Sequence, residues 1–316
     1  MYAGGRQVSV ADTDEFVQRL RDDDCDFGWI DLTTNDQRAL SRLADTLGLH
    51  ELAIEDALST HERPKVSRFA SHLLLTFASS SLDDEHEVHL ERCTCFILPN
   101  LVVTVHEPDF PMAQVVDRLE ANHDLIDHGV GYVVWGLLDV VVDGQVDVLG
   151  EVSDHTEELA DVLFSDERDT VEVQKAAFAL RHSVQRMRHA TLPMREVVNT
   201  LLRRDTQMAV RGLEPYFSDV YDHTLHAAEW AEGLRDQIGM ILETNVALQG
   251  NQMNEVMKKV TSWAAIIAVP TAITGYFGQN LQFPGFGSEA AWWVSNSFLV
   301  VFGVGLFWLF KRSDWL

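Results

Sequence analysis

Two apolar segments near the end of the chain dominate its hydrophobic pattern. They cover residues 260–280 and 290–310, and a loop at residues 281–289 joins them. Glu289 is the single formally charged residue between positions 260 and 310. An apolar run of about 18 residues or more is long enough to cross a hydrocarbon core as a helix. The pattern therefore predicts a membrane hairpin; the alternative is a buried core hairpin of a soluble protein.

Basic residues flank this hairpin on one side. Lys258 and Lys259 precede the first span, Lys311 and Arg312 follow the second, and the connecting loop contains neither Lys nor Arg. Cytoplasmic flanks carry an excess of Lys and Arg. We therefore expect both termini, including the tail at 311–316, to be cytoplasmic and the loop to lie outside.

A stripe of apolar residues at helical spacing leads into the first span. It continues from Phe217 to Leu248, with Asn245 as its polar exception. No stop signal follows it, so a cytoplasmic stalk helix at 206–259 is expected to continue straight into the membrane helix. At 1.5 Å per residue the combined helix would be on the order of 100 Å long. Such a helix needs partners along its length, which favours an oligomer around its axis.

An antiparallel pair of helices is predicted at residues 129–205, before the stalk. Its first member is apolar enough to suggest a third span, but Asp139, Asp143 and Asp147 recur at every fourth position. Each of these carboxylates would be costly at the bilayer centre. The pattern therefore favours a cytoplasmic amphipathic helix, extending to about Phe164.

Residues 1–128 have the mixed pattern of an α/β domain. Helices are expected at 35–49, with Thr34 or Asn35 as N-cap, and at 49–59; strands are expected at 27–32, 72–79, 86–98 and 101–106. Nothing at the start of the chain has the apolar core of a signal peptide, and the three cysteines imply no disulfide framework.

The formal charge of the chain is −25, and all of it falls on residues 1–259, because the four charges in 260–316 cancel. Nucleic acid is excluded as a partner, since phosphate binding needs a basic footprint. An acidic domain beside a pore would concentrate cations; adaptation for solubility or high salt is the alternative. We find no nucleotide-binding or catalytic motif, so neither an enzyme, nor ATP-driven transport, nor an organic cofactor is expected.

The order of the motifs resembles the CorA metal ion transporter family. The sequence NQMNEVMK at 251–258 precedes the first span, and Tyr-Phe-Gly-Gln-Asn at 276–280 ends it. YFSDVYDHT at 216–224 resembles the stalk-helix signature of the family, and LGLHELAIEDALSTHERPKVSRF at 47–69 resembles its N-terminal segment. The resemblance thus covers nearly the whole chain.

This resemblance implies an α+β cytoplasmic domain of αβα funnel type, a stalk helix and a two-helix hairpin in the cytoplasmic (inner) membrane. It also implies a homopentamer, with the lipid bilayer and divalent cations as its other partners. The first spans would line a central pore for Mg²⁺, with Co²⁺ and Ni²⁺ as further substrates. Cytoplasmic Mg²⁺ bound between subunits would close the channel.

The resemblance places the ion-selective mouth at Gly278, Gln279 and Asn280. The family triplet is Gly-Met-Asn, so the glutamine is a departure, and the Met-Pro-Glu-Leu that often follows is absent. A ring of Asn280 amide oxygens would hold a hydrated ion through its waters; a helix C-cap is the alternative role for Asn280. Because Gln279 leaves the ion preference open, two other functions remain: a ZntB-like Zn²⁺ transporter, with or without proton coupling, and a non-conducting metal sensor or scaffold.

Small and apolar residues at helical spacing define the predicted pore face. They are Asn254, Met257, Val260, Thr261, Ala264, Ala268, Thr271 and Gly275. Such a lining suits a conduit that gates by dewetting, with Met257 and Val260 as its constriction. Helix–helix packing also favours small residues and is the alternative.

Asp219 and Asp222 are the candidates for a regulatory Mg²⁺ site, because Asp219 matches the stalk carboxylate of the family. Asp83 or Asp84 of a neighbouring subunit would supply the partner carboxylate. The alternative is a solvated acidic surface. His86, His89, Cys93 and Cys95 are residue types that bind zinc, but their spacing fits no common zinc site, and we expect the two thiols to be core residues.

Overall fold

The computed structural model describes residues 2–3, 6–7, 27–59, 62–83, 86–165, 169–203, 211–279 and 285–316. The chain forms two compact units, Met1–Ile241 and Leu242–Leu316, and the long helix α7 contributes to both. The first unit is an α+β domain and the second contains the two apolar helices, which confirms the predicted fold class.

A five-stranded sheet forms the centre of the first unit. Its strand order is β3 (Gly28–Thr33), β7 (Leu101–His106), β6 (Val88–Ile97), β5 (Leu73–Leu82) and β4 (Lys65–Arg68). Strand β3 pairs with β7 in parallel, and the other pairs are antiparallel. A second pair joins the two-residue strands β1 (Tyr2–Ala3) and β2 (Arg6–Gln7). The four predicted strands are confirmed, whereas β4 was missed because its four residues, at the edge of the sheet, show no apolar alternation.

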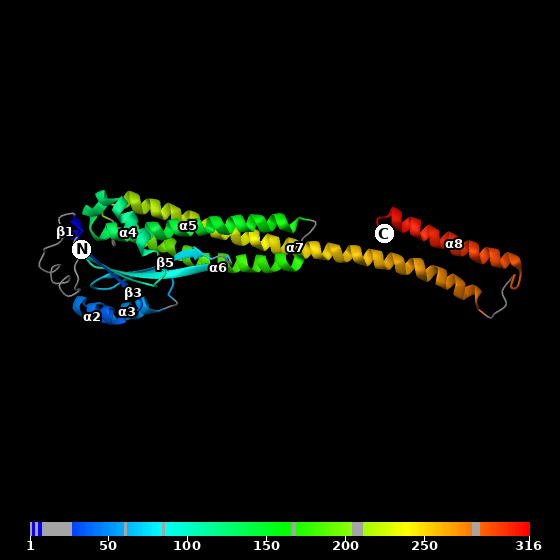
Figure 1. Ribbon diagram of the computed structural model, residues 1–316, viewed down its shortest axis with the longest axis horizontal. Helices are drawn as coiled ribbons and strands as arrows, with labels where there is room; N and C mark the ends of the chain where they lie inside the picture. Colours follow the sequence, from blue (N-terminus) through cyan, green and yellow to red (C-terminus); the bar gives the residue numbers. More distant parts are fainter. Residues whose placement is uncertain are drawn as a thin grey trace. The chain divides into compact units, whose positions relative to one another are not determined.

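Helices α2 (Gln37–Leu47) and α3 (Glu51–Leu58) cover one face of the sheet (Figure 1). They bury Leu40, Leu43, Ala53 and Ala57 against Leu74, Phe96, Val103 and Val105. The predicted N-cap of α2 at Thr34 or Asn35 is wrong, because Asp36 occupies that position. The Asp36 carboxylate accepts hydrogen bonds from the backbone N–H and hydroxyl of Thr33 instead of capping the helix.

The other face of the sheet is covered by helices α4 (Met112–Ala121), α5 (Val130–Leu163) and α6 (Thr170–Leu202), with the 3₁₀ helix η1 (His123–His128) before α5 (Figure 1). Strand β5 is buried over its first seven residues, on both of its faces. Both faces of the sheet therefore carry a hydrophobic core, which is the arrangement of an αβα sandwich.

Helix α5 is a core helix over its first half rather than an amphipathic one. Residues 130–142 are all buried, and Asp139 among them is only 6% exposed. The predicted row of solvated carboxylates is therefore wrong at Asp139, because this side chain is packed inside the domain and paired with an arginine. The rejection of α5 as a membrane span stands, since the described helices with the length and apolarity to cross a membrane are α7 and α8.

Helix α7 runs from Glu214 to Phe277 without interruption, and α8 covers Glu289–Arg312. This confirms the prediction that the stalk and the first apolar segment form one helix, which also continues through Pro270. The apolar stripe of its first part is buried at Phe217, Val220, Ala228, Leu234, Ile238 and Ile241, and Asn245 is buried with it.

Leu119 of α4 is the basis of a test of the packing between α4 and α5. It is 2% exposed, and a Cβ added to Gly136 of α5 would lie 2.5 Å from its Cδ2. Leu119→Ala should lower the unfolding temperature of the full chain in detergent by several degrees, because such deletions cost about 2–5 kcal/mol. Leu52→Ala, at a leucine that is 57% exposed, is the control. Equal shifts in the two variants would show that this contact is not tight.

Candidate ion path and acidic cluster

The first two residues of the predicted ion mouth lie directly after α7. Gly278 donates its backbone N–H to the carbonyl of Thr274 at 2.9 Å, which completes the last turn of the helix. Gly278 and Gln279 are both exposed. Asn280, the third residue of the mouth, lies outside the described residues.

A glycine is needed at position 278 because the backbone there comes close to a main-chain carbonyl of α7. A Cβ at this position would lie 2.9 Å from the carbonyl oxygen of Thr274. The oxygen belongs to the main chain of the helix, so it cannot move aside without opening the last turn. The glycine that the sequence assigns to the mouth therefore also terminates α7.

The eight predicted pore-face residues are all exposed in the single chain, including Met257 and Val260 at 57% and 58%. A different set of α7 residues is buried or partly buried: Lys258, Ser262, Ala265, Ile266, Val269, Pro270, Ile273 and Phe277. These residues recur at helical spacing and mark the side of α7 that packs on α8. The hydroxyl of Ser262 donates to the carbonyl of Trp315, at 3.4 Å, beyond the end of α8. The predicted pore face shares no residue with this packed side.

The apolar parts of α7 and α8 have the exposure expected of membrane spans rather than of a soluble core. Only 6% of the most apolar window of α7, and none of that of α8, is buried. Lys311 and Arg312 end α8, and their charged groups lie over the rings of Phe307 and Trp308 at 5.9 and 5.3 Å. Cation–aromatic pairs of this kind suit the interface between lipid and water.

An acidic cluster forms where α4, α5 and α7 meet in the first unit. The guanidinium of Arg118 donates to both Asp139 and Asp143, the latter at 2.9 Å. His223 Nδ1 lies 3.3 Å from the other carboxylate oxygen of Asp143. Beside these groups is a pocket of about 350 Å³, which Asp143, Asp147 and His223 help to line.

Burial is the main reason that the pKa of Asp139 is raised to about 6. The positive charge of Arg118 opposes this shift, while Asp143 and Asp219 add to it through charge repulsion. The arginine is shared between two carboxylates, so it does not offset the burial of Asp139. This cluster therefore carries a carboxyl group that titrates well above its ordinary range.

The predicted regulatory carboxylates differ in their surroundings. Asp219 and Asp222 are exposed on α7, and carboxylates of this kind fit a cation that prefers oxygen ligands. Asp83 accepts hydrogen bonds from His89 at 2.7 Å and from the backbone N–H of Glu87 at 2.8 Å. Asp84 lies outside the described residues. No group of three or more His, Cys, Asp or Glu side chains in the described part of the chain could hold a metal ion.

Cys93 and Cys95 are core residues, as predicted. Both are fully buried in β6, and burial raises the pKa of each thiol. The ring of His86 lies against that of His155 in a tilted arrangement, with ring centroids 3.8 Å apart. These groups do not converge on a zinc site within the described residues.

Arg118 is the residue that sequence reasoning missed. The paired spacing of Asp139 and Asp143 on an apolar helix was the available signal that these carboxylates needed a cation. Nothing in the sequence indicated which of the basic residues would supply it.

An α+β domain, a continuous long helix and two exposed apolar helices together indicate a membrane protein. The sequence profile of the CorA family, described as CorA-like Mg2+ transporter protein, matches residues 24–312, and the chain belongs to this family. The family is one of transporters rather than enzymes.

The comparisons with individual proteins agree with this assignment. The cobalt/magnesium transport protein CorA of Thermotoga maritima is 29% identical over 297 residues, which cover 91% of this chain and 83% of that protein. The complete structure of the CorA magnesium transporter from Methanocaldococcus jannaschii matches with a TM-score of 0.75 and 22% identity, covering 93% and 92% of the two chains. The ZntB cytoplasmic domain from Vibrio parahaemolyticus matches at 0.55 and 10% identity, covering 71% and 88%, and shares the fold alone.

Asp139 should make stability depend on pH between about 4 and 6. Because its pKa is higher in the folded chain than the ordinary 3.8, the folded state binds more protons in this window, and stability falls as pH rises. A shift of the pKa to about 6 corresponds to a change in the free energy of unfolding, across this window, on the order of 2–3 kcal/mol. Asp139→Asn should remove this slope from thermal unfolding curves recorded without Mg²⁺.

Asp147→Asn is the matched control for this measurement, because Asp147 is exposed on the same helix. The control should keep the pH slope of the wild type. A parallel pH dependence in wild type and Asp139→Asn would contradict the buried, raised carboxyl group.

Proposed function

We propose that this chain forms a homopentameric channel that carries divalent cations, Mg²⁺ foremost and Co²⁺ or Ni²⁺ as further substrates, across the cytoplasmic membrane. The observation that carries the proposal is the family match over residues 24–312 together with an exposed face on the apolar part of α7. The membrane potential favours cation entry by about 2.3 kcal/mol per charge per 100 mV. The relatives named for cobalt and magnesium transport support these ions over zinc.

The lining of the proposed pore is argued from the exposure of α7. A helix that packs on α8 along one side leaves its other side available to line a conduit in the proposed pentamer. Around a central axis, copies of this face would bring Asn254 to one end of the conduit and Asn280 to the other. Met257 and Val260 would form an apolar constriction between them, which passes ions only when it is wetted.

The proposed gating site uses Asp219 and Asp222 of one subunit and Asp83 or Asp84 of the next. Mg²⁺ between subunits would hold the cytoplasmic domains together and keep the constriction narrow. The exposure of Asp219 and Asp222 supports this role, because a site between chains requires ligands that are not used within one chain. The carboxylate of Asp83 would exchange its hydrogen bond to His89 for the cation.

Mg²⁺ uptake into proteoliposomes loaded with a Mg²⁺-sensitive dye tests the proposal. The wild type should conduct, and Asn280→Ala should reduce the uptake at least tenfold without preventing assembly, because the outer ring of amide oxygens is lost. Asn296→Ala is the control: it removes an amide from α8 that is bonded to the carbonyl of Trp292. Normal flux in Asn280→Ala would contradict the mouth ring.

Gln279→Met, run in the same assay, addresses the departure from the family triplet. Conduction by both proteins would identify Gln279 as a tolerated substitution. If the wild type takes up no Mg²⁺ but the variant does, the proposal names the wrong ion. The next measurement is then Zn²⁺ uptake with and without a pH gradient.

Asp219→Ala should weaken closure by internal Mg²⁺. In the wild type, Mg²⁺ should slow limited proteolysis of the cytoplasmic unit, because bound ions hold the subunits together. The variant should need several-fold more Mg²⁺ for the same protection. Asp236→Ala, on the same helix, is the control and should need the same Mg²⁺ concentration as the wild type. If Asp219→Ala also needed no more Mg²⁺ than the wild type, Asp219 would be only a solvated surface residue.

A further inference from the structure

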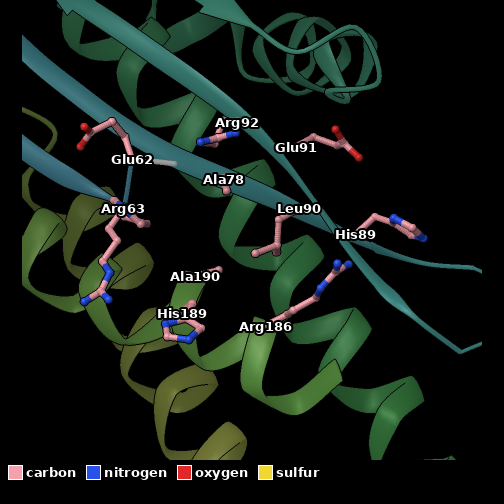
Figure 2. A pocket seen from close by; sticks show the side chains of 11 residues that line it. Glu62, Arg63, Ala78, His89, Leu90, Glu91, Arg92, Arg186, His189 and Ala190 are labelled. Carbon is pink, nitrogen blue, oxygen red and sulfur yellow. The ribbon is translucent and has the colours of Figure 1, made fainter. Parts of the chain in front are cut away.

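A second pocket in the first unit has the opposite chemistry to the acidic cluster. It has a volume of about 560 Å³ and lies between the β5–β6 strand pair and α6 (Figure 2). Its lining includes Arg63, Arg92, Arg186, His89 and His189. This concentration of basic residues occurs in a chain where Asp and Glu outnumber Lys and Arg by 49 to 24.

Two of these arginines have no carboxylate partner within the described residues. Arg186, partly buried on α6, donates to the carbonyl of Val88 through one nitrogen, and this is its one hydrogen bond in the described part of the chain. Arg63 is exposed and lines the pocket, and it has neither a hydrogen bond nor an ion pair within the described residues. Arg92 differs, since it is paired with Glu107 at 3.1 Å. Two guanidinium groups with free donors thus face one pocket.

Two glutamates also belong to the lining, and within the described residues neither is bonded to Arg63 or Arg186. Glu62 pairs with Lys65 at 2.7 Å, and the same lysine also pairs with Asp56 at 2.8 Å. Burial raises the pKa of Glu91, and the nearby Glu107 and Asp109 raise it further. The lining contains three arginines and two glutamates, so its formal charge with neutral histidines is +1.

The rest of the lining is apolar. Pro64, Ala78, Leu90 and Ala190 provide a wall without charges or strong hydrogen-bonding groups. Pockets of about 300–1,000 Å³ are typical of small organic ligands, and inorganic phosphate alone would fill only a part of this one. Guanidinium groups bind phosphate oxygens with paired hydrogen bonds.

We propose that this pocket binds a soluble, phosphate-bearing organic anion of nucleotide size. Its phosphates would bond to the guanidinium groups of Arg63 and Arg186. Its organic part would lie against the apolar wall. The site is separate from the proposed pore, but its lining residue His89 is bonded to Asp83 of the proposed gating site.

The test is a titration of the purified full chain in detergent with ATP, pyrophosphate and inorganic phosphate, by calorimetry in a potassium buffer without Mg²⁺. Omitting Mg²⁺ keeps chelation out of the measurement. ATP should bind saturably and more tightly than pyrophosphate, and inorganic phosphate most weakly. Arg63→Gln and Arg186→Gln should each weaken ATP binding about tenfold or more, because each removes charged hydrogen bonds.

Arg195→Gln is the control, since Arg195 is exposed on the same helix and does not line the pocket. It should bind ATP as the wild type does. Arg63 is exposed, so its variant decides the question even if Arg186→Gln fails to fold. Absence of saturable ATP binding, unchanged affinity in Arg63→Gln, or equal affinity for ATP and pyrophosphate would overturn the proposal. The proposal would also be overturned if the wild type did not bind ATP and the oligomer of Arg63→Gln dissociated. That result would assign the arginines to contacts between copies of the chain.

Discussion

Every backbone N–H and carbonyl inside a bilayer must find its hydrogen-bond partner within the protein, because no water is available there. An α-helix meets this condition along its whole length, in water and in lipid alike. Helix α7 uses this property, since one backbone conformation continues from Glu214 to Phe277 while the side chains change character. Phe217 and Val220 are buried in the first unit, whereas Val260 and Ile267 are exposed in the second. The domain and the span both depend on this uninterrupted helix, and so does the proposed mouth.

Much of this architecture could be predicted from the sequence, because it follows from local and periodic signals. The apolar runs predicted the two membrane-spanning segments. The absence of a helix stop signal before residue 260 predicted the continuous helix. The signals failed where the structure depends on distant parts of the chain. The buried environment of Asp139 is produced by packing against other elements, and its partner Arg118 is 21 positions away in the sequence. Strand β4 exists because β5 offers it an edge, which four residues of sequence do not reveal.

The candidate site was predictable to the same limited degree. Helical spacing identified a set of α7 residues that proves to be exposed, because exposure on a helix follows its period. Their role in conduction rests on the family and on the proposed assembly. The basic pocket could not be predicted, since Arg63 precedes β4 and Arg186 lies on α6, far apart in the chain. The net charge did not indicate this pocket. The chain has a formal charge of −25, yet Arg63 and Arg186 have no carboxylate partner within the described residues.

The missing side chain at Gly278 limits how this protein can be altered. Every other amino acid would place a Cβ against the carbonyl of Thr274, so substitution there disturbs the end of the helix before it can affect ion preference. If these residues form the proposed mouth, variation that changes which ion is accepted is restricted to positions 279 and 280. A mutational library aimed at new selectivity should hold the glycine fixed and diversify its two successors. The glutamine at position 279 is a substitution of this permitted kind.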